Sequence, residues 1–184
     1  MQGRGRRGGQ EPTPDSPADL TPEADPGDVA RSIILRQLTM GPRSRRQLAD
    51  KLAERNVPAE VAVAVLDRFE DLQLIDDAEF ARMWVRSRFQ TKSLARGALK
   101  RELADKGIAP ELAEEALEQL SPDDELDSAR DLVRRKIRPD WDLGERQVRD
   151  KHTRRLASML ARKGYPPAVA FRVVSEELDA LQED

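Results

Sequence analysis

An internal repeat of about 50 residues constrains this sequence more than any other feature. When the chain is shifted by 51 residues, a first segment aligns with a second without a gap, and a third copy follows at shifts of 48 and then 57 residues. Such a repeat predicts tandem units that stack on their neighbours, because one unit alone buries too little apolar surface. The most informative aligned columns are Ala30/Ala81/Ala129, Ile34/Val85/Val133, Leu48/Leu99/Leu156, Leu52/Leu103/Leu160 and Asn56/Gly107/Gly164.

The spacing of apolar residues inside each copy is helical. They recur three or four positions apart, and no segment alternates apolar and polar residues as a strand does. Gly41-Pro42 and Pro58 separate the stripes of the first copy, and Ser44 and Asp77 are predicted helix N-caps. The Asn/Gly column predicts a left-handed residue after the second helix of each copy, because Gly and Asn tolerate positive φ. We therefore predict three helices per copy.

The predicted fold is all-α, with three tandem three-helix modules, similar to helix-turn-helix units, that form an elongated curved rod. Residues 1–27 are predicted to be a disordered tail, since they are rich in Gly and Pro and contain one large aliphatic residue. Module 1 covers residues 28–75, module 2 covers 76–121 and module 3 covers 122–184. The longer shift in the third copy places an inserted loop at residues 139–145, between its first two helices.

Several function classes are excluded by what the sequence lacks. It contains no Cys and one His, so thiolate or His-cluster metal sites and His-based triads are not expected. No stretch is long and apolar enough for a membrane span, and the start of the chain does not resemble a signal peptide. We expect a cytoplasmic, monomeric protein that works by binding, without catalysis, cofactor or membrane.

The charges fall into bands, although the net charge is only −3. Residues 82–106 contain eight basic and two acidic residues, residues 109–127 contain eight acidic residues and no base, and residues 130–155 contain ten basic and five acidic residues. The two basic bands allow two interpretations. They are either solvated helix faces with internal ion pairs or a surface that binds an anionic partner. The residues predicted to bind a partner are Arg82, Arg86, Arg88, Lys92, Arg96, Lys100, Arg134, Arg135, Arg138, Arg149 and Arg154.

The aromatic residues and the third helices refine this interpretation. Trp84 lies beside the apolar stripe and is expected to pack, Trp141 is expected to anchor the inserted loop, and His152 is expected at the surface, at the start of a helix. The predicted third helix at 110–120 contains four Glu and no base, so it is poorly suited to enter a DNA groove lined by phosphates.

The central module carries a motif that resembles the RecX family. It runs Leu74-Ile75-Asp76-Asp77-Ala78-Glu79-Phe80-Ala81, continues through Val85 and Arg86-Ser87-Arg88, and is followed by Glu102-Leu103 and Lys106-Gly107-Ile108. Three tandem three-helix modules are also the architecture of that family.

The resemblance implies a regulator of the RecA recombinase that lies along the groove of the RecA filament on single-stranded DNA. There it would restrain ATP hydrolysis, strand exchange and the co-protease activity that triggers the SOS response. The alternative is a helical protein that binds single- or double-stranded DNA without the recombinase. Tight, salt-dependent binding to naked DNA would favour that alternative.

Overall fold

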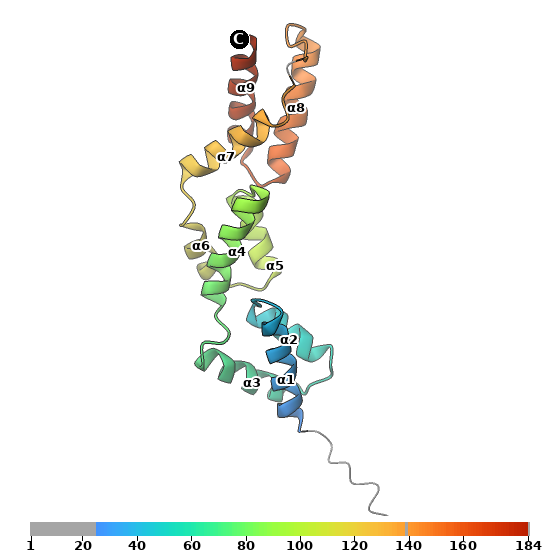
Figure 1. The fold of residues 1–184 in the computed structure, drawn as a ribbon, viewed down its shortest axis with the longest axis vertical. Coiled ribbons are helices and arrows are strands. Elements are labelled where there is room, and N and C mark those ends of the chain that lie inside the picture. Colours follow the sequence, from blue (N-terminus) through green and yellow to red (C-terminus); the bar gives the residue numbers. More distant parts are fainter. Residues whose placement is uncertain (1–24, 139, 184) are drawn as a thin grey trace, which may run out of the picture.

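The computed structural model describes residues 25–138 and 140–183, and this part of the chain folds into nine α-helices (Figure 1). The all-α prediction is confirmed. Residues 1–24 of the predicted tail lie outside the described residues, and its last two residues already belong to the first helix. No described helix has the length and apolarity needed to cross a bilayer. The helices are α1 Pro26–Thr39, α2 Arg45–Ala53, α3 Ala59–Asp71, α4 Asp77–Lys92, α5 Arg96–Asp105, α6 Pro110–Leu117, α7 Pro122–Arg134, α8 Arg146–Arg162 and α9 Pro167–Glu183.

The helices pack in consecutive triplets. The helix pairs in extensive contact all belong to α1–α3, to α4–α6 or to α7–α9, and each triplet has its own cluster of buried apolar side chains. The triplets follow one another along the length of an elongated molecule (Figure 1). We refer to them as modules 1, 2 and 3. The cores meet at one point, where Ala95, the N-cap residue of α5 in module 2, is buried in the module 3 cluster.

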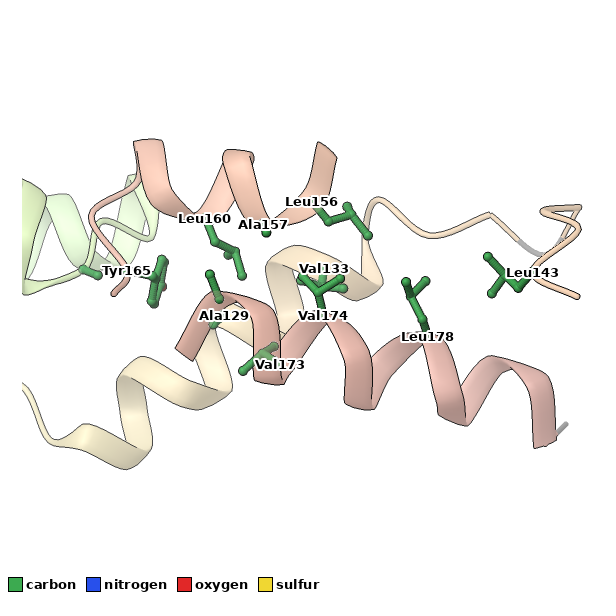
Figure 2. Close-up of a cluster of buried hydrophobic side chains, with 12 residues drawn as sticks. Ala129, Val133, Leu143, Leu156, Ala157, Leu160, Tyr165, Val173, Val174 and Leu178 are labelled. Atoms are coloured by element: carbon green, nitrogen blue, oxygen red, sulfur yellow. The ribbon is translucent and has the colours of Figure 1, made fainter. Parts of the chain in front are cut away.

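The aligned apolar columns of the repeat are the centres of these cores. Ala30, Ala81 and Ala129 are fully buried in the first helix of their modules, and the columns headed by Ile34, Leu48 and Leu52 are buried as well. A small residue at the Ala column lets the first helix lie close to its neighbours. Figure 2 shows the resulting core in module 3, where side chains of α7, α8 and α9 converge. Full burial of a Leu or Val stabilises the fold by about 1.5–3 kcal/mol, so these columns specify the triplets.

One of the two predicted helix caps is confirmed and the other is wrong. Ser44 caps α2, because its hydroxyl oxygen accepts from the amide of Gln47 at 3.3 Å and the Gln47 side chain accepts from the Ser44 amide. Asp77 does not cap α4. Asp76 takes that position and accepts from the amide of Glu79 at 2.8 Å. Asp77 is instead directed to the neighbouring module.

The first junction joins the N-terminus of α2 to module 2. The backbone amide of Arg45 donates to Oδ1 of Asp77 at 2.8 Å. The hydroxyl of Ser44, which is fully buried, donates to the carbonyl of Lys106 at 2.7 Å. Lys106 is the C-terminal cap residue of α5, so the start of one second helix meets the end of the next.

The second junction repeats this arrangement one module further along. The backbone amide of Arg96, the first residue of α5, donates to Oε1 of Glu125 at 2.8 Å. The amide of Ala95 donates to the carbonyl of Lys163, the C-terminal cap residue of α8, at 2.9 Å. Both junctions thus supply acceptors to free amides at a helix N-terminus, where the helix dipole also favours negative charge.

The Asn/Gly column is required at these junctions for two reasons. Asn56, Gly107 and Gly164 have φ of 56°, 76° and 93°, as predicted. In addition, a Cβ on Gly107 would lie 2.3 Å from Cδ of Arg46, and a Cβ on Gly164 would lie 2.2 Å from the amide nitrogen of Ala98. The column is Asn only in module 1, where the described residues place no preceding module against it.

We predict that Gly97→Ala destabilises the protein although Ala favours helices over Gly by up to about 1 kcal/mol. A Cβ at this α5 position would lie 2.7 Å from the backbone carbonyl oxygen of Gly164, across the second junction. The expected loss is about 1–3 kcal/mol of unfolding free energy, measured by urea denaturation. Gly27→Ala, in the first turn of α1, is the matched control, since its Cβ would meet only the ends of flexible side chains, the Asp25 carboxylate at 3.0 Å and the Arg31 guanidinium at 3.4 Å. Equal stability of both variants and the parent would show that the junction does not constrain Gly97.

Candidate functional site

More than half of the predicted binding residues form ion pairs inside the protein. Arg82 pairs with Glu115 on α6 at 3.4 Å, and Arg134 makes two hydrogen bonds to Glu177 on α9, at 2.7 and 2.9 Å. These contacts tie the first helix of a module to its third. For six of the predicted residues the observed contacts therefore match the internal ion-pair alternative. These residues are Arg82, Arg88, Arg96, Lys100, Arg134 and Arg149.

Arg96 has the clearest structural role in this group. Its guanidinium donates to the carbonyl of Leu117 at 2.7 Å and to that of Leu120 at 3.3 Å, at the C-terminal end of α6. Its Nε also lies 3.8 Å from Glu125 of α7. One side chain thus satisfies free carbonyls at a helix end and contacts the next module.

Trp84 packs, as predicted. Its ring stacks on Phe80 at a centroid separation of 5.7 Å, and its Nε1 donates to Glu102 at 2.8 Å. The guanidinium of Arg88 and the ammonium of Lys106 lie 4.3 and 4.5 Å from the ring centroid. The ring is therefore occupied by contacts within module 2.

The remaining predicted residues are exposed, and the described part of the chain places no acidic side chain within ion-pair distance of them. The prediction of binding stays a prediction for all eleven residues, and the charges of the unpaired ones are available to a partner. These exposed residues are Arg86, Lys92, Arg135, Arg138 and Arg154.

Two of these five residues lie in a cluster of positive charge at the second junction. Nζ of Lys163 donates to the carbonyl of Lys92 at 2.5 Å. The pKa of Lys163 is lowered by burial and, to a smaller extent, by the positive charges of Arg135 and Lys92. Like charges that repel in the isolated protein are stabilised by a negatively charged partner.

The cluster continues along α7 and α8. Lys136, Arg155 and Arg162 line one pocket, and Lys151 and Arg155 lie close enough to His152 to affect its pKa. We call the whole surface the basic band. It consists of Lys92, Arg135, Lys136, Lys151, Arg155, Arg162 and Lys163.

Five members of the basic band are not among the residues predicted to bind. Lys136, Lys151 and Arg155 lie within the predicted basic segment 130–155 but are not among the residues chosen from it, and Arg162 and Lys163 lie beyond it. Residues 151–175 contain six basic residues and no acidic residue, which was a usable signal. In a helix, a basic residue pairs locally with acidic residues three or four positions away, so a basic residue in an acid-free stretch lacks such partners.

The inserted loop is anchored by an aromatic stack. Trp141 lies on His152 with ring centroids 3.6 Å apart and an interplanar angle of 15°. Leu143 is buried in the module 3 core, and its carbonyl accepts from the Gln182 side chain at 3.0 Å. The anchoring role predicted for Trp141 is confirmed.

The placement predicted for His152 is wrong. Because α8 begins at Arg146, His152 lies in its second turn, half-buried beneath Trp141. Its Nδ1 is buried and has no hydrogen-bond partner among the described residues. The pKa of His152 is lowered, first by burial and then by the nearby charges of Arg155 and Lys151.

Comparison with known proteins gives a consistent result. Residues 30–69 match a family profile described as RecX, first three-helix domain, and residues 76–117 match RecX, second three-helix domain. The chain is 50% identical over 163 residues to the regulatory protein RecX of Streptomyces lividans, which covers 89% of this chain and 85% of that protein. It is 46% identical over 155 residues to that of Thermobifida fusca, covering 82% of this chain and 80% of the other.

Solved structures resemble the fold as well. A crystal structure of RecX from Lactobacillus salivarius superposes with a TM-score of 0.70 at 22% identity, over 84% of this chain and 97% of that one. A crystal structure of a regulatory protein RecX superposes with a TM-score of 0.67 at 26% identity, over 84% of this chain and 73% of that one.

We predict that Arg96→Gln lowers the unfolding free energy, whereas Arg154→Gln leaves it nearly unchanged. Arg96 satisfies two helix-end carbonyls, so its loss is expected to cost about 1–3 kcal/mol. Arg154 is exposed and has no acidic partner in the described part of the chain. Urea denaturation measures both values. A stability loss for Arg154→Gln as large as that for Arg96→Gln would contradict the division into paired and free bases.

We predict that the protein loses stability as the pH falls through the range in which histidine titrates. Since the folded state lowers the pKa of His152 below its ordinary value of 6.5, the unfolded chain binds the proton more readily. The contribution is fully present above pH 6.5 and is lost as the pH falls through the lowered pKa. His152→Phe retains an aromatic ring under Trp141 without a titrating group. The urea midpoint of this variant should therefore change less than that of the parent between pH values above and below 6.5. An equal change in both proteins would rule out His152 as the source of the pH dependence.

Proposed function

This chain belongs to the RecX family, and on that premise we propose that it regulates the RecA recombinase. In this proposal the rod lies along the groove of the RecA filament on single-stranded DNA and restrains ATP hydrolysis, strand exchange and co-protease activity. It acts as a cytoplasmic monomer in DNA repair, homologous recombination and the SOS response, by binding alone and without a cofactor.

The observation that carries this proposal is the basic band on an elongated molecule. The band combines residues of α4, α7 and α8, so it crosses the junction between modules 2 and 3. A filament on DNA offers negatively charged groups at many successive positions. A rod that contacts several of them at once gains affinity from individually weak contacts.

The thin junctions suit the same role. The modules are joined mainly by hydrogen bonds at helix ends and by Ala95, whereas most of each apolar core lies within one module. Small changes of angle at two junctions would let a three-module rod follow a helical groove without loss of its cores.

Direct binding to DNA without the recombinase is the second candidate. The same basic band supports it, because nucleic acid binding depends strongly on uncompensated positive charge. The third helices do not favour sequence-specific recognition. The helix α6 contains no basic residue that could contact a DNA groove, and its Glu114 and Glu115 pair with Lys100 and Arg82 of other helices.

We predict that the double variant Lys92→Glu, Arg135→Glu inhibits the single-strand-dependent ATPase activity of RecA less effectively than the parent. Reversal of two charges in the basic band replaces attraction by repulsion, and about tenfold more protein should be needed for half-inhibition. Both side chains are exposed and lie outside the module cores, so the variant is expected to fold. The measurement is ATP hydrolysis by the recombinase on single-stranded DNA.

The matched control is Arg36→Glu, Arg55→Glu, which makes the same charge change on module 1, away from the band. Equal inhibition by the parent and the Lys92/Arg135 variant would contradict the placement of the interface. Absence of inhibition by the parent, together with tight binding to naked DNA, would favour the second candidate.

A further inference from the structure

The inserted loop of module 3 helps to form a small pocket that the other modules lack. The pocket has a volume of about 220 Å³ and lies between the end of α7, the loop and α8. Its lining residues are Lys136, Trp141, Arg155, Leu156, Met159 and Arg162.

The lining combines positive charge with apolar surface. Lys136, Arg155 and Arg162 are exposed bases, and no acidic residue lines the pocket. No acidic side chain in the described part of the chain lies within ion-pair distance of these three bases. Trp141 and Met159 are half-buried and supply aromatic and thioether surface. This chemistry fits a ligand that carries both a negative charge and an apolar group.

A pocket on module 1 shows what distinguishes this one. That pocket is larger, about 310 Å³, and is also lined by basic residues, including Arg36, Lys51 and Arg55. However, Glu54 also lines the module 1 pocket and pairs with Lys51 at 2.6 Å. No aromatic side chain lines that pocket. Its positive charge is partly neutralised within the protein, whereas that of the module 3 pocket is not.

Trp141 is held in a fixed orientation. The stack on His152 fixes one face of its ring, and burial of Leu143 fixes the loop two residues further along. An aromatic ring that is already ordered loses little conformational entropy when a ligand packs against it.

We propose that this pocket binds one nucleotide of single-stranded DNA, with the base against Trp141 and Met159 and the phosphate at Arg155, Arg162 and Lys136. This inference rests on the proposed function and deepens it, since it assigns module 3 to the single strand. Proteins that bind single strands combine stacking on aromatic side chains with a positive track for the backbone. The basic band supplies that track beyond the pocket, at Lys151 on one side and at the second junction on the other.

The ring of Trp141 allows a direct test. In the full-length protein with Trp84→Phe, Trp141 is the only tryptophan, and a Phe at residue 84 keeps an aromatic ring beside Phe80. Titration with short oligo(dT) at low salt is expected to change its fluorescence. Adding Arg155→Gln and Arg162→Gln should weaken binding at least tenfold and lower the salt dependence of log K by about 0.7 per lost phosphate contact.

Three further measurements separate the parts of the proposal. Arg36→Gln with Arg55→Gln, on the module 1 pocket, should leave the titration unchanged. An oligonucleotide of abasic deoxyribose phosphate should bind with little fluorescence change, because no base reaches the ring. A poly-glutamate peptide that alters Trp141 fluorescence as strongly as oligo(dT) would overturn the assignment in favour of an acidic protein segment.

Failure of this inference is distinguishable from failure of the proposed function. If the protein inhibits RecA but oligo(dT) leaves Trp141 fluorescence unchanged, the pocket does not bind the single strand and the regulatory role stands. If oligo(dT) changes the fluorescence and the Arg155/Arg162 variant loses that response, the pocket assignment stands even where RecA is not inhibited.

Discussion

The N-terminus of one second helix donates to a carbonyl at the C-terminal end of the next at both junctions, and the arrangement of the modules depends on this contact. Ser44 donates to the carbonyl of Lys106, and Ala95 donates to that of Lys163. A carboxylate from the following first helix, Asp77 in one case, completes each junction. Buried helix ends without such partners are costly, so the contacts align the second helices head to tail.

This alignment makes the two ends of the rod different. At the module 1 end, the turn after the second helix carries Asn56, which needs only to tolerate positive φ. At the module 3 end, α8 begins at Arg146, and the inserted loop packs on it through the stack of Trp141 on His152. The insertion thus adds Trp141 and its pocket to module 3.

Charge is distributed between two tasks. Arg82, Arg96 and Arg134 stabilise contacts between helices of the same or adjacent modules, which leaves them largely neutralised. The bases near Lys163 have no such compensation, and after burial they are the further cause of its lowered pKa. A count of charges along the chain treats both groups alike, because the acid that neutralises a base can lie far away in sequence, as Glu177 lies 43 positions from Arg134.

The sequence by itself determined the helical class, the threefold repeat, the buried columns and the left-handed turns, because each depends on local periodicity or on the conformational freedom of one residue. It also predicted that Trp141 packs against its own module. The partners of charged side chains were decided only by the tertiary structure. Asp77, a plausible cap by sequence, instead joins two modules, and Lys92 and Lys163 meet although 71 residues separate them. Electrostatic contacts depend on distances in space, and in a stacked repeat those distances are set by how one module is placed on the next.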